Sequence, residues 1–211
     1  MPRIKLGVIW QMNQQAATGY LQTLSNCMLT TEVTNGQGSQ LALNEGANQA
    51  VQMILETRAK SGKIMLAGNG GSSAVVSHVQ NDLCKAVGVR ALVFTEQPLL
   101  TAFANDDGYG SVFEKPIGLW AESGDLVFTV SSSGKSENIV RGIKASRASG
   151  CNIITLSGFG PDNPSRQSGD LNFYVNSDVY GFVETAHAAL LHFMTDQAKA
   201  IIAGESRVGT V

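Results

Sequence analysis

The stretch KIMLAGNGGSS at residues 63–73 passes directly from a continuous apolar run to a turn rich in glycine and serine. An apolar run without alternation is typical of a strand that is buried on both faces of a sheet. Glycines in the turn allow the backbone to approach a ligand, and a helix that begins there offers unpaired N–H groups and partial positive charge. The stretch therefore predicts a strand, a ligand-binding turn and a helix in succession.

A second stretch, LVFTVSSSGKS at residues 126–136, repeats this order with a serine-rich turn. Its serine hydroxyls and the N–H groups of the following helix suit the oxygens of a phosphate or of a sugar. Either loop alone could be an ordinary turn. Because both loops leave the carboxyl ends of strands, where open α/β sheets bind their ligands, the two together indicate a ligand site.

The rest of the chain alternates short apolar runs with segments of helical periodicity, which predicts an α/β fold. The candidate strands are 64–67, 91–94, 126–130, 153–156 and 171–175, and the candidate helices are 73–87, 98–105, 137–149 and 179–202. Continuous apolar strands separated by helices indicate a parallel sheet with both faces covered, which is a three-layer α/β/α sandwich.

Residues 1–60 have a helical pattern, with apolar residues at helical spacing in two segments. A polar, glycine-containing break at residues 34–39 separates these segments. We therefore expect an N-terminal helical segment, residues 1–60, and a core domain, residues 61–203. The N-terminal segment is expected to pack on the core and on neighbouring subunits.

Composition excludes several classes of protein. Of 211 residues, 43% are hydrophobic and 15% are charged, and 15 Lys and Arg against 17 Asp and Glu give a net charge of −2. This balance lacks the basic excess expected for contact with nucleic acid or with an anionic membrane surface. No stretch approaches the ~20 apolar residues of a membrane span.

The cysteines favour a reducing compartment. Cys27, Cys84 and Cys151 are odd in number, far apart and without a CxxC pair, which argues against a disulfide framework and against a cysteine-type zinc module. The apolar run at residues 6–10 is too short for a signal peptide. We therefore expect a cytoplasmic protein.

Two familiar nucleotide-binding motifs are near matches. Residues 134–136 read GKS, but a P-loop would need its first glycine at Thr129, inside the predicted strand, so that motif is rejected. Gly68 and Gly70 fit the start of a dinucleotide fingerprint, with Ser73 in place of its third glycine and Glu96 as the ribose acid. A lone match of this kind is a weak signal.

The titratable residues lie on two predicted helices. His78 and Asp82 share a face at i,i+4 spacing. Glu184 and His192 fall about 80° apart on the last helix, whereas His187 projects about 140° away from His192. Two imidazoles and two carboxylates suit either a tetrahedral zinc site or an acid–base pair. Each residue alone has an equally ordinary interpretation as a surface or capping residue.

The order and spacing of several motifs resembles the sugar isomerase (SIS) domain family, closest to its sedoheptulose 7-phosphate isomerases, the phosphoheptose isomerases. The motifs are Gly68-Asn69-Gly70-Gly71-Ser72, His78, Ala104-Asn105-Asp106-x-Gly108-Tyr109 and Ser131-x-Ser133-Gly134-x-Ser136. The resemblance extends from about residue 45 to residue 200. It implies a flavodoxin-like parallel sheet of five strands and a homotetramer whose active sites lie at subunit interfaces.

The resemblance also implies an aldose–ketose isomerase that acts on a phosphorylated sugar through an enediol intermediate, with sedoheptulose 7-phosphate as the expected substrate. The substrate-binding residues that it implies are Asn69, Gly70, Gly71, Ser72, Asn105, Asp106, Ser131, Ser132, Ser133, Ser136 and Glu184. The expected catalytic residues are Asp82, as the base at carbon, and His192, as its acid–base partner. Zinc is the expected cofactor, with His78, Asp82, Glu184 and His192 as its ligands.

The chain departs from the family pattern at two of these positions. Asp82 stands where the family has a glutamate, and Glu184 stands where it has a glutamine. The shorter Asp82 side chain alters its reach, and misplacement by about an ångström is sufficient to reduce a rate on the order of a hundredfold. These departures motivate an alternative function, a non-catalytic SIS protein that senses a sugar phosphate or serves as an adaptor of the replication-initiation type.

Overall fold

The structure, a computed structural model, describes residues 17–208; the first part of the predicted N-terminal segment, residues 1–16, lies outside them. At its centre is a 7-stranded sheet in the order β2-β1-β7-β6-β5-β3-β4. The strands are β1 (Glu32–Asn35), β2 (Gln40–Leu41), β3 (Lys63–Gly68), β4 (Arg90–Val93), β5 (Leu126–Ser131), β6 (Asn152–Ser157) and β7 (Leu171–Tyr174).

The five strands from β3 to β7 pair with one another in parallel, as predicted. Across the sheet these five strands lie in the order β4-β3-β5-β6-β7. If they are renumbered 1 to 5 along the chain, this order is 2-1-3-4-5, which is the flavodoxin-like order. In such a sheet the ligand crevice opens where the strand order reverses, between β3 and β5. This is the point from which the glycine-rich and serine-rich loops leave.

The prediction of a five-stranded sheet is wrong in its count, because β1 and β2 extend the sheet with an antiparallel hairpin. The predicted break at residues 34–39 is the turn of this hairpin, where the Asn35 carboxamide oxygen accepts hydrogen bonds from the N–H groups of Gln37 and Ser39. Only Val33 of β1 is buried, so the strand is too short to produce a recognisable alternation.

The helices are α2 (Ala17–Leu29), α3 (Leu43–Ala59), α4 (Gly70–Asp82), α5 (Gln97–Asp106), α6 (Glu114–Trp120), α7 (Glu137–Ala148) and α8 (Tyr180–Val208). The predicted helix at 73–87 is α4 followed by a π-helical turn, Leu83–Val87. The short helix α6 was not predicted, because Pro116 and Gly118 give it a weak helical signal.

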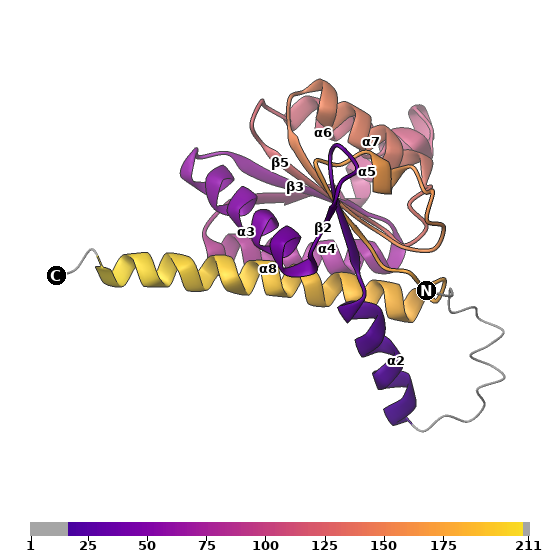
Figure 1. The fold of residues 1–211 in the computed structure, drawn as a ribbon. Helices are drawn as coiled ribbons and strands as arrows, with labels where there is room; N and C mark the ends of the chain where they lie inside the picture. The colour runs from indigo at the N-terminus through magenta and orange to yellow at the C-terminus, as the bar shows by residue number, and fades with distance from the viewer. Residues whose placement is uncertain (1–16, 209–211) are drawn as a thin grey trace.

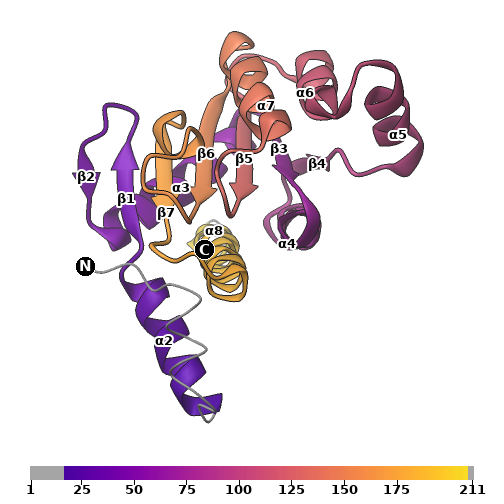
Figure 2. The same cartoon turned by 90° about the vertical axis from the view of Figure 1, so that its right-hand side faces the viewer.

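The helices form layers on both faces of the sheet (Figures 1 and 2). On one face, Leu66 and Phe128 belong to a core that also contains residues of α3, α4 and α8. On the other face, Met65 and Val127 pack in a second core with residues of α6 and α7. The three-layer arrangement predicted from the strand pattern is therefore confirmed, and it places α4 and α8 side by side on one face.

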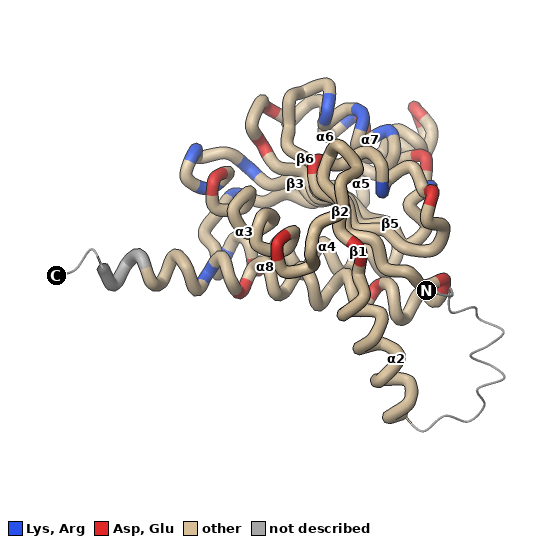
Figure 3. The backbone as a smooth tube through the Cα atoms, viewed as in Figure 1, with Lys and Arg blue, Asp and Glu red and all other residues tan. Residues whose placement is uncertain are grey.

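Helix α2 and the C-terminal part of α8 project from the three layers (Figure 1). Leu24 and Cys27 anchor α2 in a small core that includes Phe182 and Ala186 of α8. Figure 3 shows charged residues of both signs over the layered part of the molecule, whereas α2 carries none. None of the helices in the described residues combines the length and the apolar character needed to span a membrane.

Candidate active site

A pocket of about 250 Å³, which we call the serine-rich pocket, lies at the carboxyl ends of β3 and β5. It is lined by Asn69, Gly70, Gly71, Ser72, Ser131, Ser132, Ser133, Ser136, Tyr180 and Glu184. The structure thus brings the two predicted loops together with the start of α8. No Lys or Arg is among these lining residues, so an anion bound here would be held by N–H groups, hydroxyls and helix N-termini.

The glycine-rich loop is shaped by the close approach of α8. Asn69 is extended and Gly70 has a positive φ of 53°, so that α4 begins with its first N–H groups at the pocket. A Cβ on Gly71 would clash with the carboxylate of Glu184. A side chain at position 71 would therefore require the Glu184 carboxylate to move away from the start of α4.

The serine-rich loop is stabilised by hydrogen bonds within the loop, and Asn163 packs closely against it. The Ser131 and Ser133 hydroxyls accept hydrogen bonds from the N–H groups of Gly134 and Lys135, at 3.2 and 3.3 Å. Gly134 has a φ of 63° and leaves no room for a Cβ beside Asn163. The backbone of this loop is therefore fixed without any ligand.

Ser132 differs from its neighbours in the loop. Its side chain is 5% exposed, and its hydroxyl has no hydrogen-bond partner within the described part of the chain. Because buried hydroxyls almost always have a partner, this group is suited to donate to a ligand oxygen in the pocket.

A cluster of titratable side chains lies between α4 and α8. Asp82 Oδ2 is 3.5 Å from His78 Nε2 and 3.4 Å from His192 Nδ1, and the two imidazole rings meet edge to face with centroids 5.0 Å apart. One ligand atom from each of the three residues lies within 4.8 Å of the others. These side chains, which we call the His–Asp–His triad, line or adjoin a second pocket of about 250 Å³.

The triad fits a divalent metal by the chemistry of its donors. Two imidazoles and one carboxylate form a donor set found at catalytic zinc sites, where a fourth position stays open. Within this chain Glu184 is not part of the group, so its role as a fourth ligand stays a prediction. Its carboxylate lies instead in the pocket beside Gly71, eight residues and about 12 Å along α8 from His192.

Asn105 and Asp106 lie at the exposed C-terminal end of α5 and do not line the pocket of this chain. The Asn105 amide donates a hydrogen bond of 2.7 Å to Asp106. Tyr109, three residues beyond, does reach the glycine-rich loop, because its hydroxyl lies 3.1 Å from the Asn69 carboxamide oxygen.

His187 points into the protein interior and lines neither pocket, which agrees with the predicted divergence of His187 from His192 around the helix. It is fully buried, and its Nε2 lies 3.1 Å from the Ser157 carbonyl oxygen. Burial lowers the pKa of this imidazole from 6.5 to about 4, against a smaller opposing effect of the Ser157 hydrogen bond. His187 is therefore a structural residue that is neutral at physiological pH.

Two residues of this region were missed by the sequence analysis. Tyr180 lines the serine-rich pocket, and its ring meets the ring of Phe159 edge to face with centroids 4.8 Å apart. Asn138 is 2% exposed and bonds to Asn69 across the crevice. The sequence offers no signal for either residue, since one is an aromatic residue at a helix start and the other an amide in a first helical turn.

Known proteins resemble this chain over most of its length. The SIS domain family model matches residues 37–158. A phosphoheptose isomerase from Syntrophotalea carbinolica is 32% identical over 161 residues, which cover 70% of this chain and 78% of the relative. A phosphoheptose isomerase from Campylobacter concisus is 31% identical over 149 residues, covering 68% and 78%.

The fold has close counterparts among solved structures. That of a phosphoheptose isomerase from Neisseria gonorrhoeae matches with a TM-score of 0.75 at 24% identity, covering 87% of this chain and 97% of that chain. At this level of identity the match speaks for the fold alone.

Proposed function

Because the chain belongs to the SIS domain family and, within it, to the phosphoheptose isomerases, we propose that it is an aldose–ketose isomerase that converts sedoheptulose 7-phosphate to a heptose 7-phosphate. The observation that carries this proposal is the His–Asp–His triad, formed by side chains from two helices that lie far apart in the sequence. An adaptor or sensing role alone would not require two imidazoles to converge on one carboxylate.

The chemistry of the proposed reaction needs two proton transfers. A base removes the proton from the carbon beside the carbonyl and returns it to the neighbouring carbon, and an acid–base group moves the proton between the two oxygens. Asp82 is the proposed base at carbon. His192, whose Nδ1 lies 3.4 Å from Asp82, is the proposed partner at oxygen.

His78 and Asn81 support Asp82 from opposite sides in this mechanism. His78 Nε2 lies 3.5 Å from Oδ2, while the Asn81 amide donates a hydrogen bond of 3.2 Å to Oδ1. Asp82 remains 23% exposed, so its carboxylate is held in orientation and is still accessible to a substrate.

The serine-rich pocket is the proposed site for the phosphate group. It offers the free Ser132 hydroxyl together with the N–H groups that open α4 and α7. Binding the distal phosphate there would position the reacting carbons, which is how remote contacts lower the barrier of a reaction.

Zinc is the proposed cofactor, with His78, Asp82 and His192 as its ligands. When bound, zinc would polarise the carbonyl and hydroxyl oxygens of the sugar. The homotetramer with active sites at subunit interfaces, the cytoplasmic location and the absence of a nucleic-acid partner stay predictions of the sequence.

Substitution of the two proposed catalytic residues tests the function. We expect Asp82→Asn and His192→Gln each to reduce kcat by about 10²–10⁴-fold, because each removes a group that transfers a proton. The measurement is the initial rate of heptose phosphate formation, with size-exclusion elution as the check of folding. His187→Gln, at a histidine outside both pockets, is the matched control and should retain the wild-type rate at neutral pH.

Unchanged rates in both catalytic variants would contradict the assignment. A screen of C5–C7 sugar phosphates combined with metal analysis separates the isomerase from an adaptor. Stoichiometric zinc together with turnover supports the isomerase. Absence of both, with a protein partner recovered, supports the adaptor.

A further inference from the structure

A reciprocal pair of carboxamides joins the two ligand-binding loops. Asn69 Nδ2 donates to Asn138 Oδ1 at 2.9 Å, and Asn138 Nδ2 donates to Asn69 Oδ1 at 2.8 Å. Asn69 is the residue before α4, and Asn138 lies in the first turn of α7. The two helices lie on opposite faces of the sheet, so the pair bridges the crevice between β3 and β5.

The orientation of both carboxamides is determined by a backbone group. The Ile139 N–H donates to Asn138 Oδ1 at 3.0 Å, and because an N–H can only donate, the oxygen of Asn138 must face it. The NH₂ group of Asn138 then faces Asn69, so Asn69 must accept this hydrogen bond with its carboxamide oxygen. The Tyr109 hydroxyl, 3.1 Å from that same oxygen, is consequently the donor in its contact with Asn69.

These bonds use the acceptor capacity of both carboxamides. Asn69 Oδ1 accepts from Asn138 and Tyr109, and Asn138 Oδ1 accepts from Asn69 and Ile139. A carboxamide oxygen has two lone pairs, so each side chain keeps only one N–H for a further partner. Toward the pocket, Asn69 is thus a donor, which suits the oxygen of a phosphate or of a sugar.

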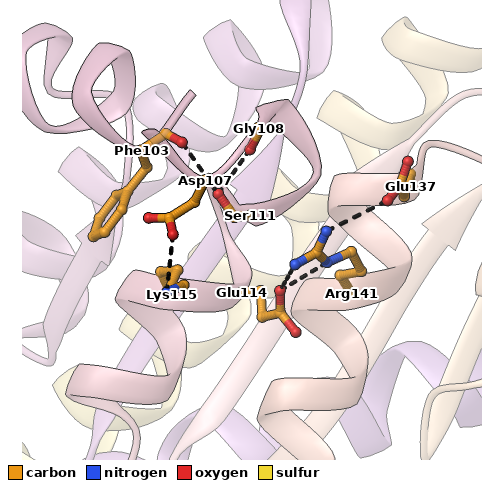
Figure 4. A network of polar contacts seen from close by, with 8 residues as sticks. All are labelled: Phe103, Asp107, Gly108, Ser111, Glu114, Lys115, Glu137 and Arg141. Atoms are coloured by element: carbon orange, nitrogen blue, oxygen red, sulfur yellow. Dashed lines mark hydrogen bonds and ion pairs between the residues drawn. The ribbon is translucent and has the colours of Figure 1, made fainter. Parts of the chain in front are cut away.

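The loop that carries Tyr109 is held in place by a polar network (Figure 4). Its members are Phe103, Asp107, Gly108, Ser111, Glu114, Lys115, Glu137 and Arg141. The Ser111 hydroxyl donates to the carbonyl oxygens of Gly108 and Phe103, at 2.7 and 3.3 Å. Arg141 of α7 pairs with Glu114 and, at 3.4 Å, with Glu137. Tyr109 therefore approaches Asn69 from a fixed position.

We propose that Asn138 is a positioning residue of the substrate site, which sets the separation of the glycine-rich and serine-rich loops through its pair with Asn69, and that Tyr109 fixes the Asn69 carboxamide as a donor. The assignment rests on the proposed function only in naming the ligand as a sugar phosphate. Asn138 itself contacts no substrate, because it is 2% exposed and does not line the pocket.

Asn138→Asp is the most informative substitution, since it keeps the shape of the side chain and removes the NH₂ group. One carboxylate oxygen would still accept from Ile139, but the other would face the Asn69 oxygen, and no rotation of Asn69 satisfies both contacts. We expect the Kd for sedoheptulose 7-phosphate and for inorganic phosphate to rise about tenfold or more. KM should rise in parallel, with a smaller change in kcat.

Two further variants separate positioning from a loss of fold. Tyr109→Phe removes one hydroxyl from a residue that is 55% exposed, and it should raise the same Kd values about two- to threefold. The double variant that combines Tyr109→Phe and Asn138→Asp should have the same Kd values for both ligands as Asn138→Asp alone. This is expected because Tyr109 acts only through Asn69. Asn152→Asp, at an exposed amide where β6 begins, is the matched control and should bind as the wild type does.

The experiment is calorimetric titration of the full chain with both probes, with thermal unfolding of each variant recorded alongside. A Kd within twofold of the wild type for folded Asn138→Asp would overturn the proposal, as would additive effects in the double variant. If Asn138→Asp does not fold, an unchanged Kd for Tyr109→Phe overturns it. Binding without turnover in the wild type would refute the isomerase and leave this test intact.

Discussion

Glu184 is the one carboxylate among the described residues that line the serine-rich pocket. Its oxygens lie against Gly71 at the start of α4, where the helix N-terminus favours a negative charge. A phosphate in the same pocket would compete for those N–H groups and would be repelled by the carboxylate. This residue therefore bears on how tightly the substrate binds.

We expect Glu184→Gln to lower the KM for the sugar phosphate several-fold, since the change removes a negative charge from a pocket that has no Lys or Arg among its described lining residues. We also expect its zinc content to be unchanged, because Glu184 lies outside the triad. Steady-state kinetics and metal analysis of the purified variant check both expectations. A loss of zinc in this variant would instead make Glu184 a metal ligand, as the family resemblance implied.

His187 makes stability depend on pH. Burial holds its pKa near 4 in the folded chain, whereas the unfolded chain titrates near 6.5. Between these values the unfolded chain binds a proton that the folded chain does not, so the free energy of unfolding falls as the pH decreases through this window.

We expect the wild type to lose about 2 kcal/mol more stability than His187→Gln between pH 7 and pH 5. Glutamine retains a donor for the Ser157 carbonyl oxygen and does not titrate. Urea unfolding at the two pH values measures the difference. Equal losses in the two proteins would show that His187 accepts its proton without unfolding.

The first residue of β3, Lys63, bonds to Asp125, the residue before β5, at the end of the sheet opposite the pocket. Asp125 accepts hydrogen bonds from the backbone N–H groups of Lys63 and Glu122, and its Oδ2 pairs with Lys63 Nζ at 2.7 Å. The Lys63 side chain is 9% exposed and that of Asp125 is 2% exposed, whereas that of Glu122 is 78% exposed. The two acidic partners of Lys63 therefore differ in burial, and Asp125 also accepts two backbone N–H groups.

This contrast gives a matched pair of substitutions. Asp125→Ala should destabilise the protein by about 3–5 kcal/mol, because it removes the buried partner of the Lys63 charge and leaves two backbone N–H groups without their acceptor. Glu122→Ala should change stability by less than about 1 kcal/mol, since an exposed ion pair contributes little. Chemical denaturation of both variants at neutral pH makes the comparison. Similar losses would contradict the role of burial.

At the scale of the whole molecule, one substrate would have to reach both the serine-rich pocket and the triad. The serine-rich pocket and the triad lie on the same two helices, with about 12 Å of α8 between Glu184 and His192. The uncharged helix α2 exposes Leu21 by 58% and Leu29 by 71%, which suits contact with a second copy of the chain. Both observations favour the predicted assembly with shared active sites.

Subunit mixing tests that arrangement. Two inactive variants, Ser132→Asp in the pocket and His192→Gln in the triad, should regain part of the wild-type activity when unfolded and refolded together. Recovery is expected because mixed assemblies would contain sites with an intact pocket from one chain and an intact triad from another. Light scattering of the mixture confirms that assemblies form. Assembly without any recovery would place each active site within one chain.

Much of the core fold could be predicted because its signals are local. The strands β3 and β5 lie within two residues of their predicted bounds, since each is a continuous apolar run followed by a turn with a distinctive composition. The hairpin of β1 and β2 could not be predicted, because its stability comes from pairing with β7, more than 130 residues away in the chain. The position of Glu184 beside Gly71 could not be predicted either. Helical spacing gives the direction of Glu184 around α8, but it does not give the residue of α4 that Glu184 contacts.

Local periodicity and composition sufficed to predict the α/β class, the glycine-rich and serine-rich loops and the shared face of His78 and Asp82, because each depends on residues within a few positions of one another. The packing of α8 against α4 was needed to bring His192 to Asp82 and Glu184 to Gly71. Contacts of this kind depend on the angle and register at which two helices meet. These are set by the side chains of the whole core, and no short stretch of sequence contains that information.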